Sequence, residues 1–339
     1  MKQSEKWYQL SGPEGDVVLS TRIRLARNLK GLPFPARLSA EQKAEVTAKI
    51  REALPPEEKL TYLKMQNMTR MDALSMVERH LISPEFSRCD EGSGLLLSDD
   101  ESVSLMLCEE DHLRMQVMRP GLQLNEAYEV ADRLDTALDA TLHFAFDDRL
   151  GYLTQCPTNL GTGMRASLML FLPALSERGA IRQLSNTVSK LGLTIRGWYG
   201  EGSKSEGHIY QLSNQVTLGI SEQAAMENLR SIALQIIREE RAEREKLAAD
   251  PRYQDAMWRA LGILRYARRL TQQEFMELSA YLRVGLATGI LTDVDFTTDD
   301  INALMNDAQP ATMMMMARQE LEPAQRDNDR AAMVRERLG

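Results

Sequence analysis

The distribution of strand-forming and helix-forming runs constrains this chain more than any other feature of its sequence. Short apolar or β-branched runs suited to strands recur from residue 17 to residue 218 and then stop. A long helical pattern follows over residues 224–249, and its nearly all-charged second half ends at Asp250-Pro251. Such a run is typical of a solvated helix face and here also marks a domain boundary. We therefore predict an α+β domain over residues 1–250 and an all-helical domain over residues 251–339.

The first domain is expected to combine short strands with a few helices. Capping residues Ser39 and Gln42 predict one helix start, and apolar positions at helical spacing predict a helix over residues 126–146. The apolar run that follows the Gly-rich stretch 159–163 is expected to be a helix ending at Leu175. The strands are expected at residues 17–25, 95–97, 103–108, 113–118, 193–199 and 208–218, the third and fourth of them forming a hairpin.

The second domain is expected to be helical throughout. Thr271 and Glu274 form a capping box, and Thr298 before two aspartates is a typical helix start. The charge run at the end of the preceding helix is interpreted as solvent-exposed, and the methionines of residues 313–316 as adaptable core packing.

Composition excludes several classes of protein. A hydrophobic content of 43% and a charged content of 27% are typical of soluble globular chains. The longest apolar stretch, residues 166–175, is far shorter than the roughly 20 residues of a membrane span, and residues 1–5 lack the apolar core of an export signal. The net charge of −8 argues against general nucleic-acid binding. The cysteines Cys89, Cys108 and Cys156 are scattered along the sequence, so we expect no disulfides and a cytoplasmic location. Together with four distant histidines, they also predict no metal site.

Two phosphate-binding patterns are nearly matched. Residues 161–166 fit GxGxxA, but no parallel βαβ unit surrounds them and no acidic residue follows about 20 positions later to bind a ribose. Residues 197–204 resemble a Walker A loop with one residue too many before the lysine, and they lie between two strands. A dinucleotide fold is therefore a weak interpretation, and a P-loop is rejected.

A set of arginines adjoins these segments. Arg22 and Arg24 alternate along a predicted strand, so both lie on one face. Arg114 follows the acidic turn, Arg165 follows the Gly-rich stretch, and Arg196 precedes the loop of residues 200–205. Each alone is most simply a surface residue. Gathered in one cleft, they would bind a triphosphate without a P-loop, but the sequence alone does not show that they converge.

Acidic side chains supply the other half of a possible reaction. Glu109, Glu110 and Asp111 are adjacent on a turn, and most such turns are simply solvated. Two carboxylates held at the tip of a hairpin would instead bind a cationic substrate and remove a proton from it. Glu201, in a Gly-Glu-Gly loop, would add a third carboxylate from a lid.

These residues carry a resemblance to the phosphagen (guanidino) kinases that spans roughly residues 15–250. Residues 20–24 (STRIR), 109–114 (EEDHLR) and 156–162 (CPTNLGT) resemble signature blocks in family order, completed by Arg165-Ala166-Ser167 and Arg196-Gly197. Fewer than 20 residues precede the first block, and the additional helical domain follows the catalytic part. That arrangement is similar to the bacterial protein arginine kinases. Residues 326–331 (RDNDRA) match the RDxxRA motif of their phosphoarginine-binding pocket, although alone they would suggest an exposed helix with local ion pairs.

The resemblance implies an ATP-dependent protein arginine kinase with a phosphagen-kinase-like fold, an antiparallel sheet flanked by helices. It implies Glu110 as the base, Glu109 as the orienting carboxylate, Glu201 as a helper from the lid, and Cys156 as a reactive cysteine. Mg²⁺ would be held mainly by the phosphates of ATP. The phosphoarginine pocket would comprise Arg326, Asp327, Arg330 and Ala331. The implied ATP site comprises Ser20, Thr21, Arg22, Ile23, Arg24, His80, Arg114, Arg165, Ala166, Ser167, Leu168, Met169, Arg196, Gly197, Trp198, Tyr199, Gly200 and Glu201.

The resemblance also implies partners. The substrates would be misfolded proteins and a heat-shock repressor with exposed arginines, marked for a Clp-type ATPase and its protease. A zinc-binding protein would activate the kinase, and the chain would form a homodimer. Two alternatives stay open at this point: a phosphagen kinase acting on free arginine or another small guanidine, and a non-enzymatic adaptor that recognises phosphoarginine.

Overall fold

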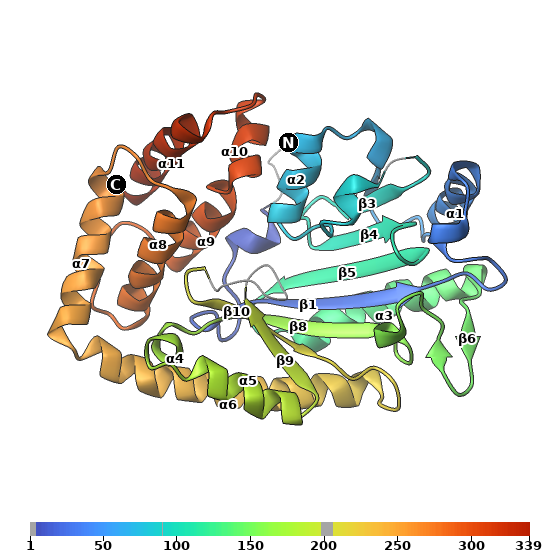
Figure 1. Cartoon of the computed structure of the whole chain (residues 1–339), viewed down its shortest axis with the longest axis horizontal. Coiled ribbons are helices and arrows are strands. Elements are labelled where there is room, and N and C mark those ends of the chain that lie inside the picture. The colour runs from blue at the N-terminus through green and yellow to red at the C-terminus, as the bar shows by residue number, and fades with distance from the viewer. Residues whose placement is uncertain (1–4, 90, 198–205) are drawn as a thin grey trace.

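A computed structural model describes residues 5–89, 91–197 and 206–339 of the chain, and its central feature is one antiparallel sheet (Figure 1). Within these ranges the sheet has eight strands in the order β2-β3-β4-β5-β1-β8-β10-β9. Their bounds are β1 (Val18–Arg27), β2 (Leu60–Lys64), β3 (Gly94–Ser98), β4 (Val103–Leu107), β5 (Leu113–Pro120), β8 (Met164–Phe171), β9 (Leu193–Gly197) and β10 (Ile209–Asn214), and a separate small hairpin pairs β6 (Phe146–Asp147) with β7 (Gly151–Tyr152).

Helices flank the sheet and form the whole C-terminal part of the chain. Those interspersed with the strands are α1 (Ala40–Glu52), α2 (Arg70–Glu78), α3 (Leu124–Leu142), α4 (Pro173–Glu177), α5 (Ile181–Lys190) and α6 (Glu222–Ala248). The C-terminal ones are α7 (Pro251–Tyr266), α8 (Gln272–Ala287), α9 (Thr298–Asp307), α10 (Pro310–Ala317) and α11 (Pro323–Leu338). Figure 1 shows this second group beside one end of the sheet, with α10 packed against α2.

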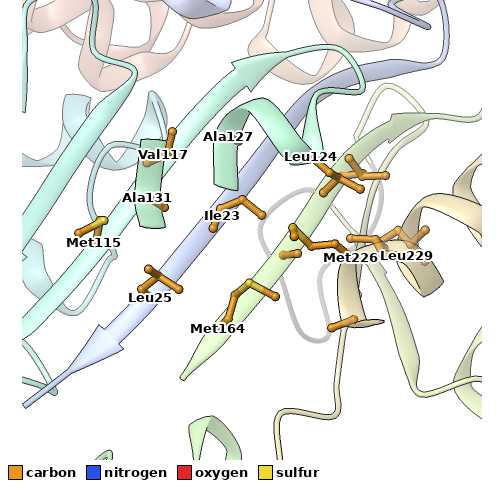
Figure 2. Packing of buried hydrophobic residues seen from close by; sticks show 14 of the residues in the cluster. Ile23, Leu25, Met115, Val117, Leu124, Ala127, Ala131, Met164, Met226 and Leu229 are labelled. Carbon is orange, nitrogen blue, oxygen red and sulfur yellow. The ribbon is translucent and has the colours of Figure 1, made fainter. Parts of the chain in front are cut away.

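One face of the sheet is apolar because side chains alternate along each strand. On β1, Ile23 and Leu25 are fully buried, whereas Arg22 and Arg24, which alternate with them, point to the other face. Figure 2 shows these two side chains beneath Ala127 and Ala131 of α3. The same core continues to α6 and includes Met226 and Leu229. Burial of this continuous apolar layer drives the pairing of sheet and helices.

Smaller apolar clusters cover parts of the opposite face, and one of them joins Trp7 and Tyr8 to Met118 of β5. Near β3 and β4 this face carries a small core that includes Phe86 and Met106. At the other end, Met169 and Phe171 of β8 pack into the core of the C-terminal helices. Polar and cationic side chains lie between these two apolar covers, so the fold leaves a polar strip across the middle of the sheet.

Most predicted elements are confirmed, and the differences have physical causes. The expected helix after the Gly-rich stretch is wrong, because residues 164–171 form β8 in the middle of the sheet. A short apolar run does not distinguish a buried strand from a helix. The helix expected to start at Thr298 does begin there, and Thr297 before it caps the helix by accepting the N–H of Asp300. The two-domain boundary stays a prediction.

The charged second half of α6 is not simply a solvated face. Glu240 and Arg244 are both buried and form an i,i+4 ion pair. The carboxylate of Glu240 also accepts hydrogen bonds from the backbone N–H groups of Ala174 and Leu175, 3.1 and 3.0 Å away. α6 therefore caps the start of α4 through a charge that the sequence pattern assigned to solvent.

None of the helices in the described ranges combines the length and the apolar character that a membrane crossing requires.

Candidate active site

The polar strip of the sheet contains a cleft of about 600 Å³, and the five arginines predicted from the sequence all line it. They come from four strands: β1 supplies two, and β5, β8 and β9 supply one each. The register places Arg24 directly opposite Arg165, and Arg196 opposite Gln211. The sheet therefore brings together side chains that are up to 174 positions apart, counted from Arg22 to Arg196.

The guanidinium groups of this cluster lie close enough to repel one another. Arg22 donates to the hydroxyl of Ser167 at 3.3 Å and to the side-chain oxygen of Gln211 at 3.1 Å, and both of these partners are uncharged. Burial and the neighbouring Arg114 and Arg165 lower the pKa of Arg22 to about 10. The same causes, with Arg22 added, lower the pKa of Arg24. Crowded guanidinium groups repel one another, and a bound polyanion would relieve this repulsion.

The predicted acidic turn connects β4 to β5 at one end of the cleft. Glu109 accepts two hydrogen bonds from the guanidinium of Arg114, at 2.9 and 2.8 Å, and a further one from the Ser83 hydroxyl. Burial raises the pKa of Glu109, but Arg114 and Ser83 outweigh it and the pKa lies below its usual value. Glu109 is thus an ionised group that fixes Arg114.

Glu110 differs from both of its acidic neighbours. Its side chain is half-buried and, among the residues that the structure describes, forms no hydrogen bond or ion pair. Burial first, and then the charges of Asp111 and Glu109, raise its pKa. A carboxylate with a raised pKa and no partner is the kind of group that enzymes use to move protons.

A second hollow of about 180 Å³ adjoins the first. It shares Arg24, Glu110, Arg114 and Arg165 with the main cleft, and segment 156–163 closes its far side. Glu110 therefore lies where the two hollows meet.

Cys156 lines this second hollow beside the acidic turn of residues 109–111. Its Sγ lies 3.0 Å from the hydroxyl of Thr158, and the thiol is half-buried and free. The prediction of a reactive cysteine stays untested, but the thiol is placed where a bound acceptor would contact it.

His80 lies between the arginine cleft and a smaller cavity that Ser20 and Met169 also line. Its backbone is left-handed, with φ at 59°. Its carbonyl accepts a hydrogen bond from Gln116 at 2.6 Å. Burial and the charge of Arg22 lower the pKa of its side chain to about 3, so the imidazole is neutral near pH 7.

Several residues of the predicted ATP site do not reach the cleft with their side chains. Ile23, Ala166 and Leu168 belong to the buried core on the other face of the sheet. Thr21 also points away from the cleft, and its hydroxyl donates to the carbonyl of Gly121 at 2.6 Å. Strand alternation is the reason, since a contiguous motif on a strand presents only every second side chain to one face.

The remaining residues of the predicted ATP site lie at the end of β9 or beyond it. Gly197 is the last residue of that strand. Trp198, Tyr199, Gly200 and Glu201 lie outside the described residues, so the lid prediction stays a prediction.

The RDxxRA motif lies on α11, and its residues differ in burial. Arg330 is only 1% exposed, so the interpretation as an exposed helix with local ion pairs is wrong for this residue. Its guanidinium donates to the carbonyls of Ala308 and Leu270, both at 2.9 Å, and to Asp327 at 3.0 Å. Arg326 is half-buried and contacts the sulfur of Met314 at 3.7 Å. Ala331 is buried in the helical core.

Sequence reasoning missed several groups that line the cleft. Gln116 follows Arg114 at strand spacing, so period two would have indicated it. Gln211 and Ser83 carry no such signal, because only the sheet register and the loop after α2 bring them to the arginines. The described ranges contain no group of three His, Cys, Asp or Glu side chains placed to hold a metal ion.

Comparisons with known proteins agree with this geometry. Residues 41–243 match the family described as ATP:guanido phosphotransferase, C-terminal catalytic domain, and residues 251–339 match the protein-arginine kinase McsB C-terminal domain. The chain is 44% identical to the protein-arginine kinase of Halothermothrix orenii over 99% of its own length and 97% of that protein's. It is 42% identical to that of Moorella thermoacetica, covering 100% and 98% of the two chains.

Solved structures show the same fold. The taurocyamine kinase of Schistosoma mansoni with bound transition-state analogue components superposes with a TM-score of 0.63 at 27% identity, covering 81% of this chain and 41% of that one. A lombricine kinase superposes with a TM-score of 0.61 at 26% identity, covering 70% and 69%.

Proposed function

The chain belongs to the protein-arginine kinases, within the ATP:guanido phosphotransferases, and from this membership we propose which residues carry out the reaction. Its activity is the ATP-dependent phosphorylation of arginine side chains in proteins. The observation that carries the proposal is the place of Glu110, where the arginine cleft meets the hollow beside Cys156.

The arginine cleft is our proposed site for the phosphates of ATP. Five cationic side chains converge there, and the pKa values of Arg22 and Arg24 are lowered by burial and mutual repulsion. A triphosphate would neutralise that charge and gain bidentate hydrogen bonds from the guanidinium groups. As charge shifts toward the leaving ADP in the transition state, the same groups would stabilise it without reorganising.

The smaller hollow is our proposed site for the acceptor arginine. The guanidinium of the acceptor arginine has a pKa above about 12, and it is a poor nucleophile while it keeps all its protons. Glu110 would bind this cation and take one proton as the nitrogen attacks the γ-phosphorus and the bond to the bridging oxygen of ADP breaks. A raised pKa makes Glu110 a stronger base once it is ionised. Glu109 would hold Arg114 in place, and His80 would contact the nucleotide as a neutral side chain.

Mg²⁺ belongs to the proposal only through ATP. The described residues provide no clustered ligands for it, so it would arrive on the phosphates, where it would neutralise their charge. The protein-derived contributions described above come from arginine, glutamate and histidine side chains.

The first test compares two glutamates of the same cleft. We expect Glu110→Gln to lower phosphoarginine formation on an unfolded protein by about 10²–10⁴-fold, the usual contribution of a general base. The control is Glu85→Gln, an exposed carboxylate on the cleft wall, which should retain nearly full activity. ATP binding is measured for both variants, and free arginine is offered beside the protein acceptor. Near wild-type transfer by the Glu110 variant would remove Glu110 from the base role.

The partners and the location also stay proposals. We propose misfolded proteins and a heat-shock repressor as substrates, a Clp-type ATPase as the reader of the mark, a zinc-binding activator and a homodimer. A cytoplasmic location fits the three cysteines, which are free thiols in the structure. For the RDxxRA segment, the half-buried Arg326 is the guanidinium best placed to meet phosphoarginine, since Arg330 is bonded within the fold.

A further inference from the structure

The turn that carries Glu110 extends beyond the strand that should support it. The pairing of β5 with β1 ends where Leu113 meets Arg27, and the pairing of β4 with β5 ends at Leu107 and Leu113. The N–H of Cys108 still donates to the carbonyl of His112 at 2.9 Å, so residues 109–111 project past the last backbone bond of this hairpin. A general base needs a geometry held to within a fraction of an ångström, so something outside the ladder must fix this turn.

Asn28, the residue directly after β1, fills this position. It is only 2% exposed. Its side-chain amide donates to the Asp111 carboxylate at 2.6 Å and to the carbonyl of Leu153 at 3.0 Å. Its side-chain oxygen accepts the backbone N–H of His112 at 2.9 Å. One buried side chain thus bonds to the two residues that follow Glu110.

Neighbouring bonds close the frame around the turn. The N–H of Gln155 donates to the same Asp111 oxygen at 2.8 Å. The N–H of Leu29 donates to Nδ1 of His112 at 3.0 Å, so the imidazole proton is on Nε2, where it donates to the carbonyl of Pro33 at 2.9 Å. The turn is bonded on one side to the segment after β1 and on the other to the segment that leads to Cys156.

The end of β1 is itself rigidly anchored. Arg27, the residue before Asn28, is buried and donates to Asp135 of α3 at 2.8 to 3.1 Å. It also donates to the carbonyl of Thr162 at 3.0 Å, and its guanidinium lies 3.5 Å from the ring centre of Tyr152. The strand that carries Arg22 and Arg24 therefore ends in a fixed point, and Asn28 starts from that point.

We propose that Asn28 is a positioning residue for phosphoryl transfer, which fixes Glu110 relative to the arginines of β1 by holding residues 111 and 112 of the turn. This inference rests on the proposed role of Glu110 as the base. One strand then sets the spacing between the donor phosphates and the proton acceptor. Only an amide fits the role, because the position needs two N–H donors and one acceptor on the same planar group.

The test exchanges the two partners of the shortest bond. Asn28→Asp keeps the acceptor for His112 but places a second carboxylate against Asp111, and the two repel each other. Asp111→Asn keeps an acceptor oxygen for both Asn28 and Gln155. The double variant N28D/D111N removes the repulsion between the two carboxylates and lets the new amide at position 111 donate to the carboxylate at position 28, but the carbonyl of Leu153 still loses its donor, so the repair is partial.

The measurements are kcat and the KM for ATP, at pH 8, with an unfolded protein as acceptor. We expect N28D to lower kcat by about 10–100-fold, the usual cost of misplacing a catalytic group by about 1 Å. The KM for ATP should change by less than about threefold, because the β1 arginines are held by the sheet and by Arg27. The double variant should recover part of this loss, with a kcat at least about threefold above that of N28D.

Two results would overturn the inference. The first is an N28D variant whose kcat stays within about threefold of wild type, and the second is a loss that the double variant does not repair. Should N28D alone not fold, Asn28→Ala is measured in its place, and a kcat within about threefold of wild type there refutes the positioning role. Glu110→Gln is measured in parallel, so that failure of the proposed base is seen separately from failure of the positioning role of Asn28.

Discussion

Replacement of Arg330 by alanine separates a structural role from a ligand-binding role in the RDxxRA motif. The guanidinium is buried and donates to the carbonyls of Ala308 and Leu270 and to the carboxylate of Asp327. Ala308 caps the end of α9, so Arg330 joins α11 to the end of that helix. Alanine leaves two buried carbonyls without a donor, at about 1–3 kcal/mol each. Asp327 keeps an exposed partner in Arg269 at 3.3 Å.

These contributions together predict a loss of about 3–5 kcal/mol in the free energy of unfolding, the range seen when one partner of a buried ionic pair is removed. The assay is urea unfolding of the full chain, followed by circular dichroism. The matched control is Arg326→Ala on the same helix, where a half-buried guanidinium contacts the sulfur of Met314. Its loss should stay below about 1 kcal/mol.

Calorimetric titration of both variants with phosphoarginine completes this experiment. An Arg330→Ala chain that unfolds at the wild-type urea concentration, yet no longer binds phosphoarginine, would refute the structural role and make Arg330 a ligand. A destabilised Arg330 variant beside a stable Arg326 variant that has lost phosphoarginine binding would assign the two roles as the structure suggests.

Two further predictions concern the acid limb of activity and the contact between α2 and α10. The charge of Asp111 helps to raise the pKa of Glu110, and the base acts when it is ionised. Asp111→Asn should therefore move the acid limb of the pH profile of kcat/KM to lower pH. An acid limb that does not move would show that Glu110 is not the titrating group. The Glu78 carboxylate accepts hydrogen bonds from the backbone N–H groups of Ala311 and Thr312, at 2.8 and 2.7 Å, and so caps the start of α10. Glu78→Ala should therefore cost about 0.5–2 kcal/mol of stability in thermal unfolding. An unchanged Tm would contradict this capping role.

Local sequence signals predicted the elements of the fold well, because the information lies within a few residues. Ser39 and Gln42 do form the expected capping box. The Glu109-Glu110-Asp111 turn does connect a hairpin of β4 and β5. The exception was β8, where the polar Arg165 and Ser167 at strand spacing were outweighed by the length of the apolar run.

Position in the fold decided what each motif residue can do. Thr21 and Ile23 lie within a signature block, yet their side chains point away from the cleft. Asn28 lies outside every block, yet it bonds to the acidic turn. Arg330 lies in a recognition motif, yet it connects helices. These outcomes depend on sheet register and helix packing, which join residues distant in the sequence.

The sequence by itself determined the chemistry that this chain carries, namely five arginines, an acidic turn and a family of kinases that phosphorylate arginine. It determined these because residue types, strand period and motif order are local properties. Only the tertiary structure decided that the arginines share one cleft and that Asn28 bonds to the turn. It also decided that Glu110, alone among the three turn acids, forms no side-chain hydrogen bond or ion pair within the described residues. Convergence and burial are set by long-range packing, and an exposed carboxylate differs from a catalytic one only through such surroundings.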